Sequence, residues 1–248
     1  MQYKKIIVCI LLTINLNLFA DGMVNDELFI AVLRCSQSRL DDKEYYISRI
    51  KELLNNGANP NIKFPDEDRI FLPGSPGGSG FIWYLDGGLT PLMVAIYPEV
   101  INLLVEFGAD INIQDKYGRT ALMLHSFLEI TDIVPLLIEK GAEINLKDDE
   151  GRTALFYAIW CCKVKVIETL INHGADINIV DRKGYTPLDI ARIRYTLPET
   201  STEMIRILTI SGARNRIVID NEKIEIYRNS IAEYGWWPRD LYISYGDR

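Results

Sequence analysis

One five-residue phrase recurs at a fixed interval: Gly108-Ala109-Asp110-Ile111-Asn112, Gly141-Ala142-Glu143-Ile144-Asn145 and Gly174-Ala175-Asp176-Ile177-Asn178. The phrases start at 108, 141 and 174, so both steps are 33 residues. A second phrase keeps the same interval: Gly118-Arg119-Thr120-Ala121-Leu122, Gly151-Arg152-Thr153-Ala154-Leu155 and Gly184-Tyr185-Thr186-Pro187-Leu188. Self-similarity at this period predicts a solenoid of short helix pairs, in which each unit contacts only its neighbours.

The unit at 148–180 illustrates the local logic of the repeat. Gly151 closes a turn that favours a positive φ angle, and Thr153 is a good N-cap for the helix that follows. A second helix has Val164, Ile167, Leu170 and Ile171 on one face at helical spacing. Gly174 then ends that helix, as glycine often does.

These phrases resemble the ankyrin repeat, whose pattern is a β-turn finger, a Thr-Pro-Leu-His helix start, two antiparallel helices and a Gly-Ala-Asp exit. The helix start recurs at Thr90-Pro91-Leu92 and Thr186-Pro187-Leu188, and with Ala in place of Pro at Thr120-Ala121-Leu122 and Thr153-Ala154-Leu155. The histidine is replaced everywhere, by Met93, Met123, Phe156 and Asp189. We therefore expect the hydrogen bond between Thr and His that is associated with this motif to be lost.

The expected fold is an all-α ankyrin-repeat solenoid of about five helix-pair units with β-turn fingers. The first unit is degenerate, with helices at 26–35 and 45–56 joined by a long connection. The other units run over 89–113, 114–146, 147–180 and 181–214. The second unit is three residues short near Tyr97-Pro98, and the fifth has an enlarged loop at 194–201.

Two segments do not follow the repeat. The insert 64–88 is rich in Gly and Pro and carries aromatic residues, so it either binds a partner beside the concave surface or packs on its own solenoid. The tail 216–248 has two strand-like stretches, at 217–219 and 224–227, followed by many large aromatic residues. We expect the tail to cap the open end of the last unit, with partner binding as the alternative.

The first twenty residues have the layout of a secretory signal peptide. Lys4 and Lys5 precede an apolar run that starts at Ile6, and Ala20 is a suitable cleavage point. A retained membrane anchor is the alternative, but the run is short for a spanning helix. We therefore predict three parts, a signal peptide at 1–20, a repeat domain at 21–215 and a tail at 216–248, in an exported bacterial protein of the periplasm or the medium.

The acidic charge and the few histidines exclude several kinds of function. The net charge is −7, and loss of the two signal-segment lysines makes it −9, which disfavours binding to nucleic acid or anionic lipid. We find no nucleophile with a base, no phosphate loop and no metal-ligand spacing, so we predict no enzyme activity, no cofactor and no metal. His125 stands where other units have Ala, which indicates a packing substitution. Cys35, Cys161 and Cys162 form no disulfide framework and are expected to be packing residues.

The resemblance also implies where a partner binds, because ankyrin proteins use their finger tips and the exposed side of the first helices. Carried over by position, the finger residues are Lys116, Tyr117, Arg119, Asp149, Glu150, Arg152, Arg182, Lys183 and Tyr185. The ends of the first helices add Tyr97, Phe127 and Trp160, of which the last two are packing residues in the alternative interpretation. The insert adds Phe81, Trp83 and Tyr84. We expect the finger and helix-end residues to form one continuous stripe.

The predicted function is a non-enzymatic module that binds a partner protein through this concave surface. One form of it is the masking or inhibition of an exported partner, as an immunity protein does. The alternatives are a structural protein that self-associates through its aromatic tail, and an enzyme with an active site in the insert.

Overall fold

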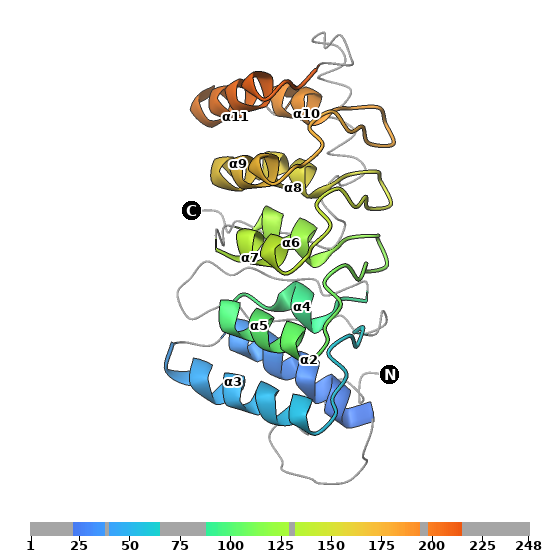
Figure 1. Cartoon of the computed structure of the whole chain (residues 1–248), viewed down its shortest axis with the longest axis vertical. Coiled ribbons are helices and arrows are strands. Elements are labelled where there is room, and N and C mark those ends of the chain that lie inside the picture. The colour runs from blue at the N-terminus through green and yellow to red at the C-terminus, as the bar shows by residue number, and fades with distance from the viewer. Residues whose placement is uncertain (1–21, 38–39, 65–87, 129–131, 194–197, 215–248) are drawn as a thin grey trace, which may run out of the picture.

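The computed structural model describes residues 22–37, 40–64, 88–128, 132–193 and 198–214. Within these ranges every regular element is a helix, and the helices form five pairs stacked along one axis (Figure 1). The predicted all-α solenoid is therefore confirmed. The signal segment 1–20, the insert between 65 and 87 and the tail from 215 onward lie outside the described residues.

The helices pair in chain order. The pairs are α2 (Gly22–Gln37) with α3 (Leu40–Asn55), α4 (Pro91–Val94) with α5 (Pro98–Glu106), α6 (Ala121–Phe127) with α7 (Ile133–Glu139), α8 (Ala154–Trp160) with α9 (Val164–Asn172), and α10 (Pro187–Ile193) with α11 (Pro198–Ile210). The first helix of each pair packs on the first helices of its neighbours, so α6 lies between α4 and α8. All seven residues of α6 are buried, whereas α5 and α9 bury one face only.

The first pair differs from the expectation. Helices at 26–35 and 45–56 with a long connection were predicted, but α2 spans Gly22–Gln37 and α3 already begins at Leu40. Hydrophobic periodicity locates only the buried face of a helix, and the first turns of α3 are polar, with Asp42 and Glu44 exposed. Acidic residues at a helix N-terminus favour the helix without leaving a periodic signal.

The three residues missing from the second unit shorten its first helix. Only four residues form α4, compared with seven in α6, α8 and α10. Two side chains from neighbouring helices, Ser36 and His125, bind backbone C=O and N–H groups in and just after α4. The Ser36 hydroxyl donates to the Val94 carbonyl at 2.7 Å and accepts from the Ile96 N–H at 3.4 Å.

His125 is the second of these side chains. It is fully buried in α6, and its Nε2 donates to the Leu92 carbonyl at 3.3 Å. Burial lowers the pKa of His125 to about 4, while the bond to Leu92 opposes this shift, so the ring is neutral near pH 7. His125, which was predicted to be a packing residue in place of Ala, therefore also donates a hydrogen bond to the preceding unit.

Asparagines of the recurring phrase join each unit to the next. Asn112 Nδ2 donates to the Gly141 carbonyl at 3.3 Å, and its Oδ1 accepts from the Glu143 N–H at 2.9 Å. Asn61 and Asn145 repeat both bonds, and Asn178 Oδ1 accepts from the Arg214 N–H at 2.8 Å. This Asn ladder fixes the register of the units.

The fingers project from one side of the stack, opposite the second helices (Figure 1). Where the insert leaves and rejoins the solenoid, the Phe64 N–H donates to the Leu89 carbonyl at 2.9 Å, so its two ends are adjacent. No helix in the described ranges has both the length and the apolar character needed to cross a membrane.

Candidate functional site

The structure describes three complete fingers, which we name finger I (114–119), finger II (147–152) and finger III (180–185). Each is organised by one buried aspartate. In finger I, Asp115 Oδ1 accepts from the N–H groups of Tyr117 and Arg119, and the Asp115 N–H donates to the Arg119 carbonyl at 2.9 Å. Asp148 and Asp181 make the same three bonds in fingers II and III.

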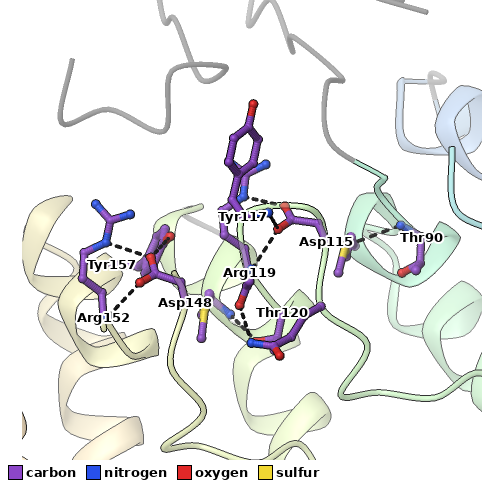
Figure 2. Close-up of polar contacts among 12 residues, drawn as sticks. Thr90, Asp115, Tyr117, Arg119, Thr120, Asp148, Arg152 and Tyr157 are labelled. Carbon is purple, nitrogen blue, oxygen red and sulfur yellow. Dashed lines mark hydrogen bonds and ion pairs between the residues drawn. The ribbon is translucent and has the colours of Figure 1, made fainter. Parts of the chain in front are cut away.

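In fingers I and II, an inward-pointing arginine of the same finger binds the aspartate (Figure 2). Arg119 Nε donates to Asp115 Oδ2 at 2.5 Å, and Arg152 Nε donates to Asp148 Oδ2 at 2.7 Å. The Tyr157 hydroxyl, from α8, also donates to Asp148 Oδ2 at 2.7 Å. Burial, and then the Asp148 carboxylate, raise the pKa of Tyr157, so the phenol remains a donor at any physiological pH.

Two predicted partner-binding residues are not on the surface. The Arg119 side chain is 3% exposed, because it points inward to the Asp115 carboxylate. Phe127 is 5% exposed, since it belongs to the wholly buried helix α6. The expectation that these two side chains face a partner is therefore wrong, and for Phe127 the packing alternative holds.

The other finger residues lie at or near the surface. Lys116, Asp149, Glu150, Arg182 and Lys183 are exposed. Half-buried side chains accompany them, namely Tyr117, Arg152 and Tyr185. We call these eight the tip residues. Their exposed charges are positive on finger I, negative on finger II and positive on finger III.

The Tyr117 ring is held by cations of its own finger. The Lys116 Nζ lies 5.1 Å from the ring centroid, and the Arg119 Cζ lies 4.7 Å from it. Both distances fall within the range of cation–π interactions. These two contacts orient the Tyr117 ring.

Backbone hydrogen bonds fix the fingers to one another. The Asp149 N–H donates to the Tyr117 carbonyl at 2.9 Å, and the Arg182 N–H donates to the Glu150 carbonyl at 2.8 Å. Fingers I and II lie so close together that a Cβ on Gly118 would be 2.8 Å from the Asp149 nitrogen. The tip residues therefore form one row in fixed register.

Tyr97 and Trp160 lie apart from this row. Tyr97 is not on a first helix, because α4 ends at Val94; it is the N-cap of α5, and the Lys43 Nζ lies 4.6 Å from its ring centroid. Trp160 is half-buried at the last position of α8. Finger II lies directly before α8, and a seven-residue helix is about 10 Å long. Trp160 is therefore separated from finger II by the length of this helix. Phe81, Trp83 and Tyr84 lie outside the described residues.

The fifth unit recovers the helix-start hydrogen bond in another form. The Asp189 carboxylate accepts from the Thr186 N–H at 2.9 Å and from the Thr186 hydroxyl at 2.8 Å. The Thr–His bond is absent as expected, but Thr186 has another side-chain partner, because the shorter aspartate makes a capping box. Asp189 is fully buried.

Finger III lacks the internal arginine. Tyr185 occupies the position of Arg119 and Arg152, and Asp181 Oδ2 is buried with no hydrogen-bond partner among the described residues. Burial raises the pKa of Asp181, while the N–H groups of Tyr185 and Lys183 oppose that rise. The change from Arg to Tyr is visible in the sequence, since Tyr185 stands at the place of Arg119 and Arg152 in the repeat. Its consequence for Asp181 is not visible there, because it depends on the arginine side chain pointing inward.

The described residues include no group of three or more His, Cys, Asp or Glu side chains placed to hold a metal ion. No curated protein matches the chain. A family model for ankyrin repeats in three copies matches residues 41–148, 92–181 and 131–217, which together cover well over half of the 248 residues. With the stacked helix pairs, the projecting fingers and the 33-residue period, these matches show that the chain belongs to the ankyrin-repeat family.

Proposed function

We propose that this protein is a non-enzymatic module that binds a partner protein through the tip residues. Ankyrin repeats generally mediate protein–protein interaction, and proteins built from them are typically not enzymes. The tip residues are Lys116, Tyr117, Asp149, Glu150, Arg152, Arg182, Lys183 and Tyr185. Trp160, Tyr97 and the insert residues Phe81, Trp83 and Tyr84 extend the contact in this proposal.

One observation carries the proposal: the fingers are rigid at the base and charged at the tip. Buried Asp115 and Asp148 are clamped by arginines, while Asp149, Glu150 and Arg182 next to them are exposed. A preorganised surface loses little conformational freedom on binding, which favours affinity. Charges in fixed order also select a partner of complementary charge.

The proposal includes export. The segment 1–20 directs secretion and is removed at Ala20, and the mature chain covers the functional surface of an exported partner, as an immunity-type inhibitor does. Mass spectrometry of the protein recovered from outside the cytoplasm tests this step. An N-terminus at Asp21 is expected, and a chain that retains residues 1–20 contradicts it.

The binding surface is tested by charge reversal at the tips. The variant Lys116→Glu/Arg182→Glu/Lys183→Glu changes fingers I and III, and the control Lys51→Glu/Lys140→Glu/Lys165→Glu makes the same change of charge on exposed lysines of α3, at the end of α7 and on α9. Affinity capture from the secreted and periplasmic fractions with the wild type identifies the partner. Titration calorimetry with that purified partner then compares the three proteins.

We expect the tip variant to bind at least tenfold more weakly and the control to bind within about threefold of the wild type. Far-ultraviolet circular dichroism checks that both variants keep their helices. Equal losses in both variants point to a general charge effect, and full binding by a folded tip variant shows that the partner binds elsewhere; either result contradicts the proposal.

A further inference from the structure

The exposed charges of the tip residues change sign from one finger to the next. They are the ammonium group of Lys116 on finger I, two carboxylates on finger II and two cations on finger III. The carboxylates belong to Asp149 and Glu150, and the cations belong to Arg182 and Lys183. The order along the row is therefore positive, negative, positive, although the whole chain carries a net charge of −7.

Lys147 is a further exposed cation of finger II, but it lies outside the tip. The Asp148 N–H donates to the Arg152 carbonyl at 2.9 Å, and this bond closes the turn after Lys147. Arg152 itself is half-buried, and its Nε donates to the Asp148 carboxylate at 2.7 Å. The exposed charges inside the turn of finger II are therefore acidic.

The opposite charges of fingers II and III are neighbours that do not neutralise each other. The Arg182 N–H donates to the Glu150 carbonyl at 2.8 Å, so these two residues lie side by side. Within the described ranges, no ion pair joins the Arg182 side chain to the Asp149 or Glu150 carboxylate. All three side chains are exposed, so a partner in contact with the row can reach their charges.

The spacing of the row follows from the helices behind it. Fingers I, II and III lead into α6, α8 and α10, which pack side by side in that order (Figure 1). Packed helices have axes about 8–10 Å apart, so the charges of successive fingers lie at about this interval. The Debye length at physiological ionic strength is also about 8 Å, so a partner in contact with the row meets three separate charges.

We propose that the partner protein presents a line of charges in the order acidic, basic, acidic, at intervals of about 8–10 Å, which pairs with fingers I, II and III. This inference rests on the proposed function, since it takes the tip residues as the binding surface. Finger II repels a uniformly acidic partner, and fingers I and III repel a uniformly basic one. The net charge of −7 alone favours a basic partner, so the row of fingers reverses that expectation.

Neutralisation of finger II tests the order of charges. The variant Asp149→Asn/Glu150→Gln removes its two exposed carboxylates, and the control Glu106→Gln/Glu139→Gln removes two exposed carboxylates from α5 and α7. Titration calorimetry uses the partner purified by capture with the wild type. We expect the finger II variant to bind at least about fivefold more weakly and the control to bind within about twofold of the wild type.

Equal or tighter binding by the finger II variant overturns the inference, because a uniformly acidic partner gains from the loss of these carboxylates. The proposed function survives that result if the variant Lys116→Glu/Arg182→Glu/Lys183→Glu still binds more weakly. If neither variant changes binding, the proposed function and this inference fail together.

Designed probes test the order without the natural partner. Each probe is a three-helix bundle with three charged residues at heptad spacing on one helix, which places them about 10 Å apart. One probe has the order Glu-Lys-Glu and the other has Glu-Glu-Glu, and fluorescence anisotropy measures their binding to the full chain. With Asp149→Lys/Glu150→Lys, we expect the first probe to bind at least about threefold more weakly and the second at least about threefold more tightly. Any other pair of results overturns the inference, since charges elsewhere on the chain are the same in both proteins.

Discussion

Replacement of Gly118 by Ala should separate finger I from finger II. Gly118 has a φ angle of +74°, and a Cβ there would lie 2.8 Å from the Asp149 nitrogen and 3.0 Å from the Asp148 Cα. Both neighbours are backbone atoms, so no side-chain rotation relieves the contact. The finger must move, and the bond from the Asp149 N–H to the Tyr117 carbonyl is lost.

The magnitude follows from comparison with Gly184→Ala. Gly184 has a φ angle of +85° but nothing within 4 Å of its Cβ position, so its substitution isolates the backbone cost. The left-handed conformation costs alanine about 1–2 kcal/mol, of which about 0.4–1 kcal/mol is offset by the stiffer unfolded chain. Steric overlap in Gly118→Ala adds about 1–3 kcal/mol. We therefore expect Gly184→Ala to lose about 1 kcal/mol and Gly118→Ala about 2–4 kcal/mol.

Urea unfolding gives both free energies of unfolding, and hydrogen exchange reports the Asp149 amide directly. Faster exchange of this amide in Gly118→Ala, with unchanged exchange in Gly184→Ala, places the damage between the two fingers. If the two variants lose the same stability within about 0.5 kcal/mol, the close contact between fingers I and II is not a constraint and the reasoning is refuted.

Three further predictions concern Tyr157, His125 and Cys162, each measured by urea unfolding. Tyr157→Phe should lose about 1–2 kcal/mol, since Asp148 Oδ2 keeps its arginine but loses the hydroxyl donor; no loss would show that this bond contributes nothing. His125 has a pKa of about 4 in the folded chain and 6.5 as its ordinary value, so the unfolded chain takes up the proton first. Wild-type stability should therefore fall by up to about 3 kcal/mol between pH 6.5 and pH 4 relative to His125→Gln, and parallel pH profiles would contradict this. Cys162 has a φ angle of 54°, so Cys162→Gly should gain about 0.5 kcal/mol, whereas Cys161→Gly, at a φ angle of −97°, should lose stability.

The repeat was predictable because its recurring Gly and Thr residues determine where helices end and begin. Gly174, for example, ends α9 with a φ angle of +92°, as its place in the recurring phrase indicates. Thr120 caps α6, as its place before a helix start indicates. These roles depend on backbone geometry within a few residues, so the period and the turn chemistry locate the helix pairs between 121 and 180 without knowledge of the packing. In the fifth unit the prediction is wrong at one end, because α11 begins at Pro198, inside the loop predicted at 194–201.

Side-chain direction was not predictable in the same way. Arg119 and Lys116 belong to the same turn, yet one is buried against Asp115 and the other is exposed. The difference arises because Arg119 follows Asp115 by four residues and turns back to its carboxylate. Likewise, Phe127 and Trp160 close corresponding helices, but only the tryptophan reaches the surface. A contact within finger I decides the first outcome and packing against neighbouring helices decides the second, and the repeat pattern alone contains neither.

In the proposed function, the arrangement of charge allows one scaffold to keep its shape and still vary in what it binds. Charges that determine the finger's shape, such as Asp115 and Arg119, are paired inside it, where removal of one partner leaves a buried charge. Charges such as Glu150 and Arg182 take part in the row through their backbone groups, so their side chains are not needed for the bond that joins the fingers. Substitution at the tips should therefore change the choice of partner with little effect on stability, whereas substitution at the buried pairs should do the opposite. A row of this kind can acquire a new partner without acquiring a new fold.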